Sequence, residues 1–519
     1  MDIKMLIALA GVIVAAMSTE LNSAVSSILL SDISGSTGMS HDPATWFTAV
    51  YDTAEIFGMA ISPWFAITLS LRGWTLGVIV TTTVSSVLVP ATDNLTLLYM
   101  LRAVQGLCGG LTIPLLMTTA LRALPPAIRL YGLACYSLTA TFFPNLALAV
   151  AALWAGTGDS PLGWQWAFFQ SVPLGLIAAA LVWYGMIQDP PKLERFRRFD
   201  WRGAVLVLLG FGSLAVMFQQ GDRYDWFNSP TICVLALTAA VCIPAFGINE
   251  WFHELPLLRL QMLGRRNFAY ALITLFVFLI VTQAASTVPN MYLTSVQHYR
   301  PAQAYLITAE IAASQLLLLP LMAWLLDFEW LDARILSFIG MACLLAACIG
   351  DSFLTAVWQR PQFYLWQGFA SVGEAMIVMP LLMKATNVVK IEEAPFASAM
   401  VNMPRAVSAT ASVWLLELIE RWRGALHSDR ITDQIGQDRF RTIQGHGVLR
   451  TSPPPLLGDG TPRTPHALDD FYRAVEAQVR VLTISDMFVV LGCICVGLIV
   501  LVMILPERTY PPRIALAKK

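Results

Sequence analysis

Long apolar stretches recur along the whole chain, and short polar segments separate them. A helix needs about 20 mostly apolar residues to cross the hydrocarbon core of a bilayer. Fourteen stretches approach this length. They cover residues 5–30, 45–70, 74–91, 95–121, 128–154, 166–186, 201–218, 230–248, 268–291, 302–326, 335–353, 362–383, 395–418 and 484–505. The pattern therefore predicts an all-α polytopic membrane protein with about fourteen transmembrane helices, the first of them retained.

The charges of the short loops predict the orientation of these helices. Lysine and arginine gather on the cytoplasmic side of a membrane protein. Here they gather in residues 192–202, in residues 259–266 and in the tail after residue 507, whereas the loops 31–44, 92–94 and 156–163 contain neither residue. With fourteen spans the three basic segments fall on one side, so we expect both termini in the cytoplasm.

One long polar segment, residues 420–482, interrupts the pattern before the last span. It contains many arginines and the proline run 453–455. Long segments cross the membrane largely regardless of their charge, so we expect this one outside the cytoplasmic face. Apolar residues recur at helical spacing over 469–481, which predicts a helix leading into the last span.

The chain also contains a short internal repeat. Tyr99 is followed by Pro114-Leu115-Leu116-Met117, and Tyr364 is followed by Pro380-Leu381-Leu382-Met383. Many secondary transporters are built from such repeats, with the binding site between the halves. We therefore predict a six-helix bundle in residues 1–187, a linker and two extra helices in 188–266, a second bundle in 267–419 with 483–507, and an extracytoplasmic loop in 420–482.

Composition narrows the functional class. The chain is 56% hydrophobic and 13% charged, against roughly 25% charge in an ordinary soluble domain. A net charge of -1 gives no reason to expect nucleic acid binding. The eight cysteines lie in apolar runs, which indicates buried thiols rather than disulfides. No histidine pair has metal-ligand spacing and no nucleophile–base pair is evident, so we expect no metal, no cofactor and no enzymatic activity.

Arg102 is the most informative single residue, because it interrupts the apolar run 97–117. A cation in the middle of a transmembrane helix costs at least about 2.5 kcal/mol, so such residues usually have a function. Gly106 and Gly110 follow on the same helix, and small residues let a second helix approach closely. A polytopic protein with a charged interior indicates transport.

The sequence around Arg102 resembles the fourth-helix motif of the major facilitator superfamily, in the form Leu101-Arg102-x-x-Gln105-Gly106-x-x-x-Gly110. Other motifs are similar to the fourteen-helix drug:proton antiporters of the EmrB type, namely Trp164-x-Trp166-x-Phe168-Phe169, Asp225-Trp226-Phe227, Arg266-Asn267-Phe268 and Asn402-x-x-Arg405. The resemblance implies two six-helix bundles plus two inserted helices, alternating access, and proton-driven export of small organic compounds across a bacterial inner membrane. In Gram-negative members it also implies a periplasmic adaptor and an outer-membrane channel.

The chain departs from the family pattern at three places. The first-helix aspartate of the family aligns with Asn22, and an amide cannot cycle a proton. The segment 63–68 lacks the charges of the inner gate. In the fifth helix, Pro144 is followed by alanines where the family has glycines. Transport is therefore indicated more directly than its coupling to protons.

Seven of the ionisable residues within the predicted spans are candidates for proton coupling or for an ion pair. Asp52 and Glu55 are three residues apart and share a helical face; the others are Glu20, Arg102, Glu310, Glu374 and Arg405. Such residues face the interior of a bundle and pair with one another, and burial or a second carboxylate tunes a carboxyl group for proton exchange. Our hypothesis is that Asp52 with Glu55, or Glu20, replaces the missing aspartate. A hydrated position or a static hydrogen bond is the alternative for each.

We expect the substrate cavity to be mostly apolar with a few polar anchors. The predicted spans supply Asn22, Trp46, Tyr51, Phe142, Phe143, Asn145, Gln283, Asn290, Tyr292 and Gln315 as candidates, although aromatic residues also serve packing. The acidic residues would favour cationic substrates and the arginines would admit anionic ones. The sequence therefore leaves the sign of the substrate's charge open. Export of one natural product, siderophore or aromatic compound is the nearest alternative function, and a non-transporting membrane scaffold is a second.

Overall fold

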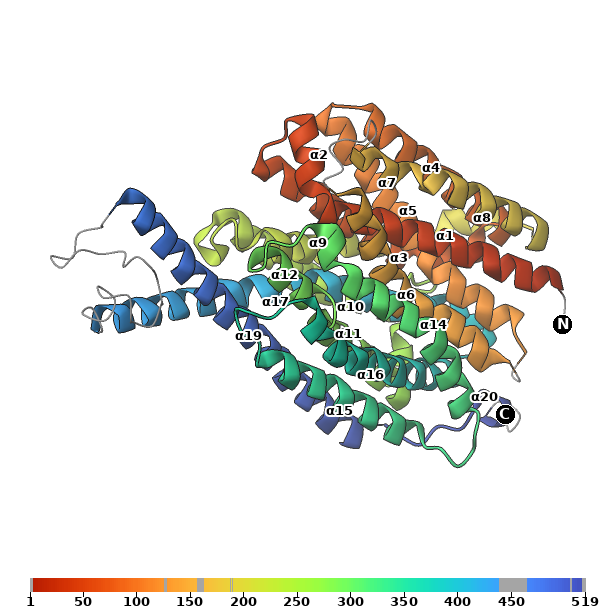
Figure 1. Ribbon diagram of the computed structural model, residues 1–519. Helices are drawn as coiled ribbons and strands as arrows, with labels where there is room; N and C mark the ends of the chain where they lie inside the picture. The colour runs from red at the N-terminus through yellow and green to blue at the C-terminus, as the bar shows by residue number, and fades with distance from the viewer. Residues whose placement is uncertain are drawn as a thin grey trace.

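The structure is a computed structural model, and it describes residues 3–125, 128–155, 163–186, 188, 190–437, 464–504 and 506–515. Over these residues the chain forms helices and no strand, which confirms the predicted all-α class. Figure 1 shows that both ends of the chain lie at the same end of the molecule, while α17 and α19 project from the opposite end. We call these two ends the terminal face and the distal face.

The helix bounds follow the predicted spans closely. The helices are α1 (Ile3–Ile28), α2 (Leu30–Thr37), α3 (His41–Thr68), α4 (Leu71–Leu88), α5 (Leu95–Ala123), α6 (Arg129–Trp154), α7 (Trp166–Phe169), α8 (Ser171–Gly185), α9 (Trp201–Gln220), α10 (Pro230–Phe252), α11 (Arg266–Val281), α12 (Thr287–Ser295), α13 (Pro301–Ala304), α14 (Leu306–Leu326), α15 (Ala333–Ser352), α16 (Arg360–Asn387), α17 (Ala394–Gln437), α19 (Pro465–Ile504) and α20 (Pro512–Ala515).

Twelve helical segments of the described chain are long and apolar enough to cross a membrane. The predicted second and thirteenth spans correspond to α3 and α17, which are 28 and 44 residues long but too polar to meet that criterion. Both pack among the other helices, α3 against α5 and α9, and α17 against α3 and α11. Their polarity comes in part from Asp52, Glu55 and Arg405, the residues on which the site prediction depends.

The repeated motif marks the two central helices. The apolar segment of α5 is 89% buried and that of α16 is 83% buried, more than any other candidate span of the described chain. Pro114 lies inside α5 and Pro380 lies inside α16. The repeated motif therefore lies on two equivalent helices, α5 before the inserted helices and α16 after them.

The inserted pair α9 and α10 lies at the side of the molecule. Only 17% of the apolar segment of α10 is buried, and Leu237, Ile248 and Phe252 are among its exposed side chains. Contiguous apolar surface of this kind marks contact with lipid. Helix α10 packs mainly on α9, and α9 packs on both α3 and α17. Helix α9 is therefore the element that connects the insertion to the rest of the molecule.

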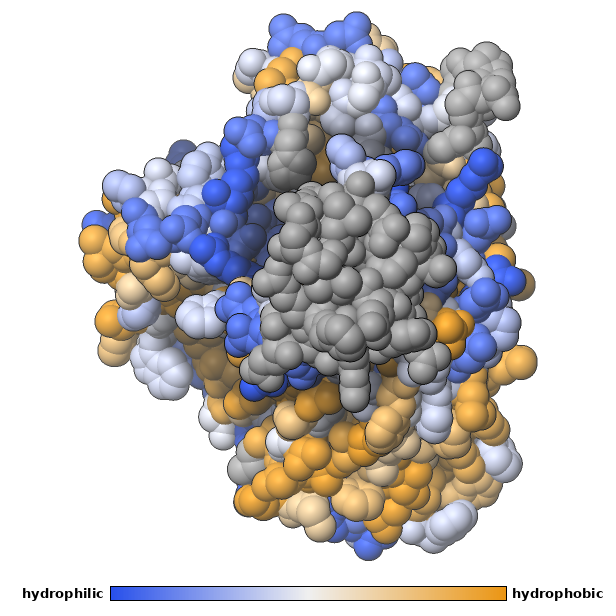
Figure 2. Space-filling view, turned by 60° about the vertical axis from the view of Figure 1, so that its left-hand side comes forward, coloured by the Kyte–Doolittle hydropathy of each residue, from blue (hydrophilic) through white to orange (hydrophobic). Residues whose placement is uncertain are grey.

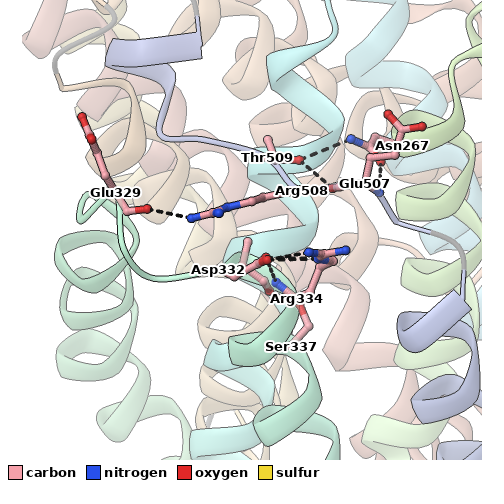
Figure 3. Close-up of polar contacts among 9 residues, drawn as sticks. Asn267, Glu329, Asp332, Arg334, Ser337, Glu507, Arg508 and Thr509 are labelled. Carbon is pink, nitrogen blue, oxygen red and sulfur yellow. Dashed lines mark hydrogen bonds and ion pairs between the residues drawn. The ribbon is translucent and has the colours of Figure 1, made fainter.

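Contacts at the terminal face gather the predicted basic segments. The Lys192 amide donates to the Thr68 carbonyl at 2.8 Å, and Arg266 lies 3.5 Å from Glu507. In Figure 3 the segment after α19 lies across the loop before α15, where Arg508 donates to the Glu329 carbonyl at 3.2 Å. The end of α3, the start of α11 and the segments after α8, α14 and α19 therefore take part in these contacts.

Figure 3 also shows Asp332 and Arg334 at the start of α15, where their side chains lie 2.8 Å apart. Burial opposes the charge on Asp332, but hydrogen bonds from the Arg334 side chain and backbone hold its pKa below the usual value. The Asp332 carboxylate also accepts from the Arg334 amide at 2.9 Å and so caps the helix. This pair fixes the point at which α15 begins.

The structure of residues 420–482 differs from the predicted loop. Residues 469–481 are helical as expected, but α17 continues to Gln437 and α19 already begins at Pro465, so much of the predicted loop 420–482 is helix. Residues 438–463, with the proline run, lie outside the described residues. The Asp486 carboxylate accepts from Arg423 at 2.6 Å and joins the two helices. The high charge of residues 420–437 concealed this helical extension in the sequence.

Figure 2 shows the molecule with its α17 and α19 end turned forward. Hydrophilic residues lie on both sides of the centre of this view, while hydrophobic residues cover the lower flank. On the extension itself, Arg473–Asp469 and Arg480–Glu476 form ion pairs across one helical turn of α19. The apolar flank suits a hydrocarbon surrounding and the charged extension suits water.

Candidate transport cavity

A cavity of about 300 Å³ lies between the helices that precede the insertion and those that follow it. We call α1 to α8 the first half and α11 to α19 the second half. The cavity is lined from the first half by α1, α3 and α6, and from the second half by α11, α12, α16 and α17 with the turn between α11 and α12. Its volume is that of a small ligand site.

Carboxylates dominate the chemistry of this cavity. Glu20 on α1, Asp52 and Glu55 on α3, and Glu374 on α16 all line it. Arg405 on α17 is the one lysine or arginine among the described lining residues. Its guanidinium forms an ion pair with Glu20, which joins the two halves. The acids therefore outnumber the bases, and the single base is already neutralised.

The remaining three acids have weaker partners. The Gln219 side-chain amide on α9 donates to Asp52. Glu374 has only a long contact, 3.4 Å, from the Gln315 amide, which also donates to the Ser371 carbonyl at 3.0 Å. Within the described part of the chain, neither Glu55 nor Glu374 has an ion-pair partner. The cavity thus holds unpaired carboxyl groups on both of its sides.

Two glycines of the Arg102 motif allow α5 to approach α3. A Cβ atom on Gly106 would lie 2.1 Å from the Tyr51 carbonyl oxygen, and one on Gly110 would lie 2.0 Å from the Glu55 carbonyl oxygen. Contacts this short are impossible for a side chain, so only glycine fits at either position. With α3 held against α5 in this way, its Asp52 and Glu55 side chains line the cavity.

Arg102 itself is fully buried and does not line the cavity. It donates to the Asn22 carbonyl at 3.2 Å and to the Gln105 side chain at 2.9 Å. Its guanidinium also lies over the rings of Phe47 and Tyr51, at 4.6 and 4.4 Å from their centroids. These contacts hold α1, α3 and α5 together.

The cavity extends toward the distal face. Its lining on α1 runs from Glu20 to Ser27, near the end of that helix, and on α17 from Arg405 to Val413. On the other side the halves are in contact, since Ser398 donates to the Pro114 carbonyl at 2.7 Å and Tyr136 donates to Asn402 at 2.8 Å. The structure is therefore closed toward the terminal face.

The start of α17 is fixed on this closed side. Arg265 donates twice to Glu393, at 2.8 and 2.9 Å, and once to the Val388 carbonyl. Burial opposes the charge on Glu393, but the hydrogen bonds from Arg265 and from the Lys390 amide hold its pKa below the usual value. The Glu393 carboxylate therefore stays charged and holds the first residues of α17 in place.

Comparison with known proteins decides the family, because residues 9–413 match the family described as Major Facilitator Superfamily. The chain belongs to the major facilitator superfamily. The predicted family and fold are thereby confirmed, and the protein is a multi-pass membrane transporter rather than an enzyme.

Several relatives of this transporter are known. It is 28% identical over 434 residues to the multidrug export protein EmrB of Haemophilus influenzae, with 80% of each chain covered. It is 25% identical to the fatty acid resistance protein FarB of Neisseria gonorrhoeae, again with 80% of each chain covered. Among solved structures, a POT family transporter aligns with a TM-score of 0.61 at 12% identity, covering 96% of this chain and 95% of the other.

The transporter cavity contains some of the predicted polar residues and excludes others. Pro144, Asn145 and Gln283 line it. Asn22 does not, since its amide is 1% exposed and exchanges hydrogen bonds with Ser86 and Ser171. Gln105 belongs to the same buried network, where it donates to Ser86 at 3.0 Å. These amides position α1, α4, α5 and α8 instead of meeting a substrate.

Most of the predicted aromatic residues also lie outside the cavity lining. Tyr51 donates to the Thr19 carbonyl at 3.3 Å, and Phe142 and Phe143 pack on each other at 5.5 Å. Tyr292 is buried, with its hydroxyl on the Thr355 carbonyl; Asn290 and Gln315 are buried as well. The described lining of the cavity therefore consists of aliphatic and polar side chains without an aromatic ring.

Trp46 and Glu310 both lie outside the lining of the transport cavity. Trp46 lines a separate apolar groove of about 360 Å³ between α3, α5 and α9. Glu310 lies on an exposed face of α14, outside the cavity lining, so the structure does not bring it near the other acids. The sequence places Trp46 and Glu310 within predicted spans, but membership of a span gives no information about the direction in which a side chain points.

Sequence reasoning missed the small hydroxyl residues of the cavity, which include Thr48, Thr282, Ser286, Thr287 and Ser408. Only Thr48 had a usable signal, because it lies four residues before Asp52 and therefore on the same helical face. Among the described residues, His466, Asp469 and Asp470 form the one three-residue group with metal-ligand geometry. They are exposed on the extension, and exposed acidic groups commonly gather without a metal.

Proposed function

We propose that this transporter exports small organic compounds across a bacterial inner membrane by alternating access, with proton entry as the driving force. One observation carries the proposal: a cavity between the two halves that is lined by Glu20, Asp52, Glu55 and Glu374 and contains a single, paired arginine. The names of the relatives, multidrug export and fatty acid resistance, support export rather than uptake.

The carboxylates supply what proton coupling needs. A buried carboxyl group without a cation partner binds a proton more readily than an exposed one, and neighbouring carboxylates reinforce this effect. Asp52 and Glu55 lie on the same face of α3 and both meet the cavity. We infer that they take the part of the family aspartate, because Asn22 stands in its place and is committed to a buried network.

The charge of the cavity supports cationic amphiphiles as substrates. Arg405 is neutralised by Glu20 and Arg102 is buried outside the lining. Glu55 and Glu374 remain on opposite walls to receive a positive group. An anion would have to enter beside these carboxyl groups without an uncompensated base to meet it.

The predicted orientation places both termini in the cytoplasm and the extension of α17 and α19 in the periplasm. The three basic segments support it, because they share the terminal face with both ends of the chain. We infer that the charged extension docks a periplasmic adaptor and, through it, an outer-membrane channel. Removing residues 424–482 should then stop export by cells and leave substrate binding intact, and export that survives the deletion would refute the docking role.

Transport into inside-out vesicles tests the main proposal. We expect tetraphenylphosphonium to accumulate when a proton gradient is imposed and to leak out when the gradient is collapsed. Tetraphenylborate, which has nearly the same size and shape but a negative charge, should bind at least tenfold more weakly to the purified protein. Equal binding of the two ions would reject the cationic substrate class, and no gradient-dependent accumulation would reject proton coupling.

Single substitutions test the roles of the carboxylates. Asp52→Asn, Glu55→Gln and Glu20→Gln should each lower gradient-driven accumulation by roughly ten- to a hundredfold, the loss typical of a missing proton-transfer group. Glu310→Gln is the matched control, because Glu310 is exposed on α14, and it should leave accumulation unchanged. Proton-coupled transport that survives all three cavity substitutions would exclude these residues as carriers.

The same vesicles separate the alternative functions. An exporter dedicated to one natural product, siderophore or aromatic compound would reject the synthetic cation but respond to its own substrate in an efflux screen. A non-transporting scaffold would show neither accumulation nor substrate-dependent proton movement. The ion pair between Arg405 and Glu20 and the cavity between the halves favour a working transporter over a scaffold.

A further inference from the structure

Inserted helix α9, which belongs to neither half, contacts a residue that lines the central cavity. The Gln219 side chain, in its last turn, donates to the Asp52 carboxylate at 2.5 Å. Asp52 lines the cavity, so this contact links the insertion to a group at the proposed transport site. The next residue, Gln220, points elsewhere and accepts from Thr45 and Arg223.

The same end of α9 is attached to both halves. Toward the first half, Arg223 forms an ion pair with Asp42 at 2.7 Å and donates to Thr45 at 3.0 Å. Toward the second half, Phe218 stacks on Trp414 of α17 with ring centroids 5.1 Å apart. Helix α9 is therefore held in a fixed position next to Asp52, rather than resting loosely in the lipid.

An amide is well suited to this position. Its N–H group donates to a charged carboxylate, and its carbonyl accepts from a protonated carboxyl group, so it satisfies both states of Asp52. The charged groups that face Asp52 come from several other helices: Glu20 on α1, Glu55 on α3 itself, Arg102 on α5 and Arg405 on α17. Among the described residues of α9, Gln219 is the one that hydrogen-bonds to Asp52.

We propose that Gln219 is a positioning residue of the transport site, through which the inserted helix holds the Asp52 carboxyl group in the cavity. The role of Asp52 in proton movement rests on the proposed function, whereas the contact itself does not. Loss of the donor disfavours the charged form of Asp52, so Asp52 should retain its proton to a higher pH. A hydrogen bond to a charged group contributes about 1.5 kcal/mol or more, which corresponds to about one pH unit.

Infrared difference spectroscopy of the purified protein tests the contact without relying on transport. The carboxyl stretching band of Asp52 is identified as the band that is lost in the Asp52→Asn variant. In Gln219→Leu, its titration midpoint should move up by about one pH unit, and Gln219→Asn, whose amide is one methylene shorter, should move it in the same direction. Gln220→Leu is the matched control and should leave the midpoint unchanged, because Gln220 contacts Thr45 and not Asp52.

Transport then tests the consequence for function. The pH at which gradient-driven accumulation is half-maximal should shift in Gln219→Leu, and the substitution should have no further effect in an Asp52→Asn background. An unmoved Asp52 band, or an equal shift in Gln220→Leu, would overturn the positioning role. A shifted band in a protein that shows no proton-driven accumulation would support the contact and reject the proposed function, so the two failures are distinguishable.

Discussion

At the scale of single residues, the charged motif of α5 has a structural task that makes the cavity chemistry available. Arg102 ties α1, α3 and α5 together through carbonyl, amide and ring contacts. Gly106 and Gly110 let the backbone of α3 lie directly against α5. Asp52 and Glu55 of α3 line the cavity beside this contact. The motif predicts transport correctly, although its arginine meets no substrate.

Substitution of Gly106 tests this close approach. Gly106→Ala should destabilise the protein by roughly 1–3 kcal/mol, because the added Cβ would lie 2.1 Å from the Tyr51 carbonyl oxygen and would force the helices apart. Thermal unfolding of the detergent-solubilised protein measures the effect. Gly77→Ala on α4 is the control, since no atom lies within 4 Å of its added Cβ, and it should not lower the unfolding temperature. Equal unfolding temperatures for both variants would contradict the packing argument.

At the scale of elements, the turn after α9 forms a clasp, which we define as residues 218–226 with their partners on α3 and α17. Arg421 of α17 forms ion pairs with Asp222 and Asp225 of this turn, while Arg223 holds Asp42 of α3. Trp226 adopts a left-handed conformation, with φ of 50°, and packs against Trp414. The clasp spans the distal ends of the two halves, where the cavity extends.

Removal of the clasp should depopulate the state seen here. In a chain without native cysteines, the thiol of Ala409→Cys, at an exposed position of the cavity lining, should react about two- to fivefold more slowly with an impermeant maleimide added at the distal side when Arg421 is replaced by alanine, since exposed ion pairs contribute modestly. Arg473→Ala, which removes an ion pair within the extension, is the control and should leave the rate unchanged. An unaltered rate in Arg421→Ala would show that the clasp does not bias the cavity.

At the scale of the whole molecule, the two halves meet in two different ways. Toward the distal face they are separated by a cavity lined with polar and charged groups. Toward the terminal face they are in direct contact, through Tyr136 with Asn402, Ser398 with Pro114, and an apolar cluster in which Leu130 and Ala134 pack near Met379 and Met383. Alternating access requires the second set of contacts to open.

Cross-linking across the closed side tests this requirement. Ser137 and Met379 lie on different halves with their side chains 3.3 Å apart, so cysteines at both positions should form a disulfide that stops transport, and a reducing agent should restore it. The control pair is Cys348 with Gly492→Cys within the second half, where the added Cβ would lie 3.3 Å from the Cys348 Cβ. Its disulfide should leave transport intact, and loss of transport in both pairs would point to a general effect of cross-linking.

The sequence by itself determined the membrane class, the all-α fold and the family, because hydropathy and short motifs are local properties of the chain. It also identified α5 and α16 as equivalent helices through their shared proline motif. It did not determine how each helix is rotated. Glu310 and Glu374 both lie in apolar helices, yet one is exposed and the other lines the cavity.

Only the tertiary structure decided which acids share a site. Glu20 and Arg405 are far apart in the sequence and form an ion pair across the halves. Gln219 donates to Asp52 from an inserted helix that no sequence pattern connects with the cavity. The physical reason is that these contacts depend on close packing between helices. Packing fixes rotation and depth through many small steric contacts, whereas the apolar pattern of a membrane helix reports only that it is surrounded by hydrocarbon or by other helices.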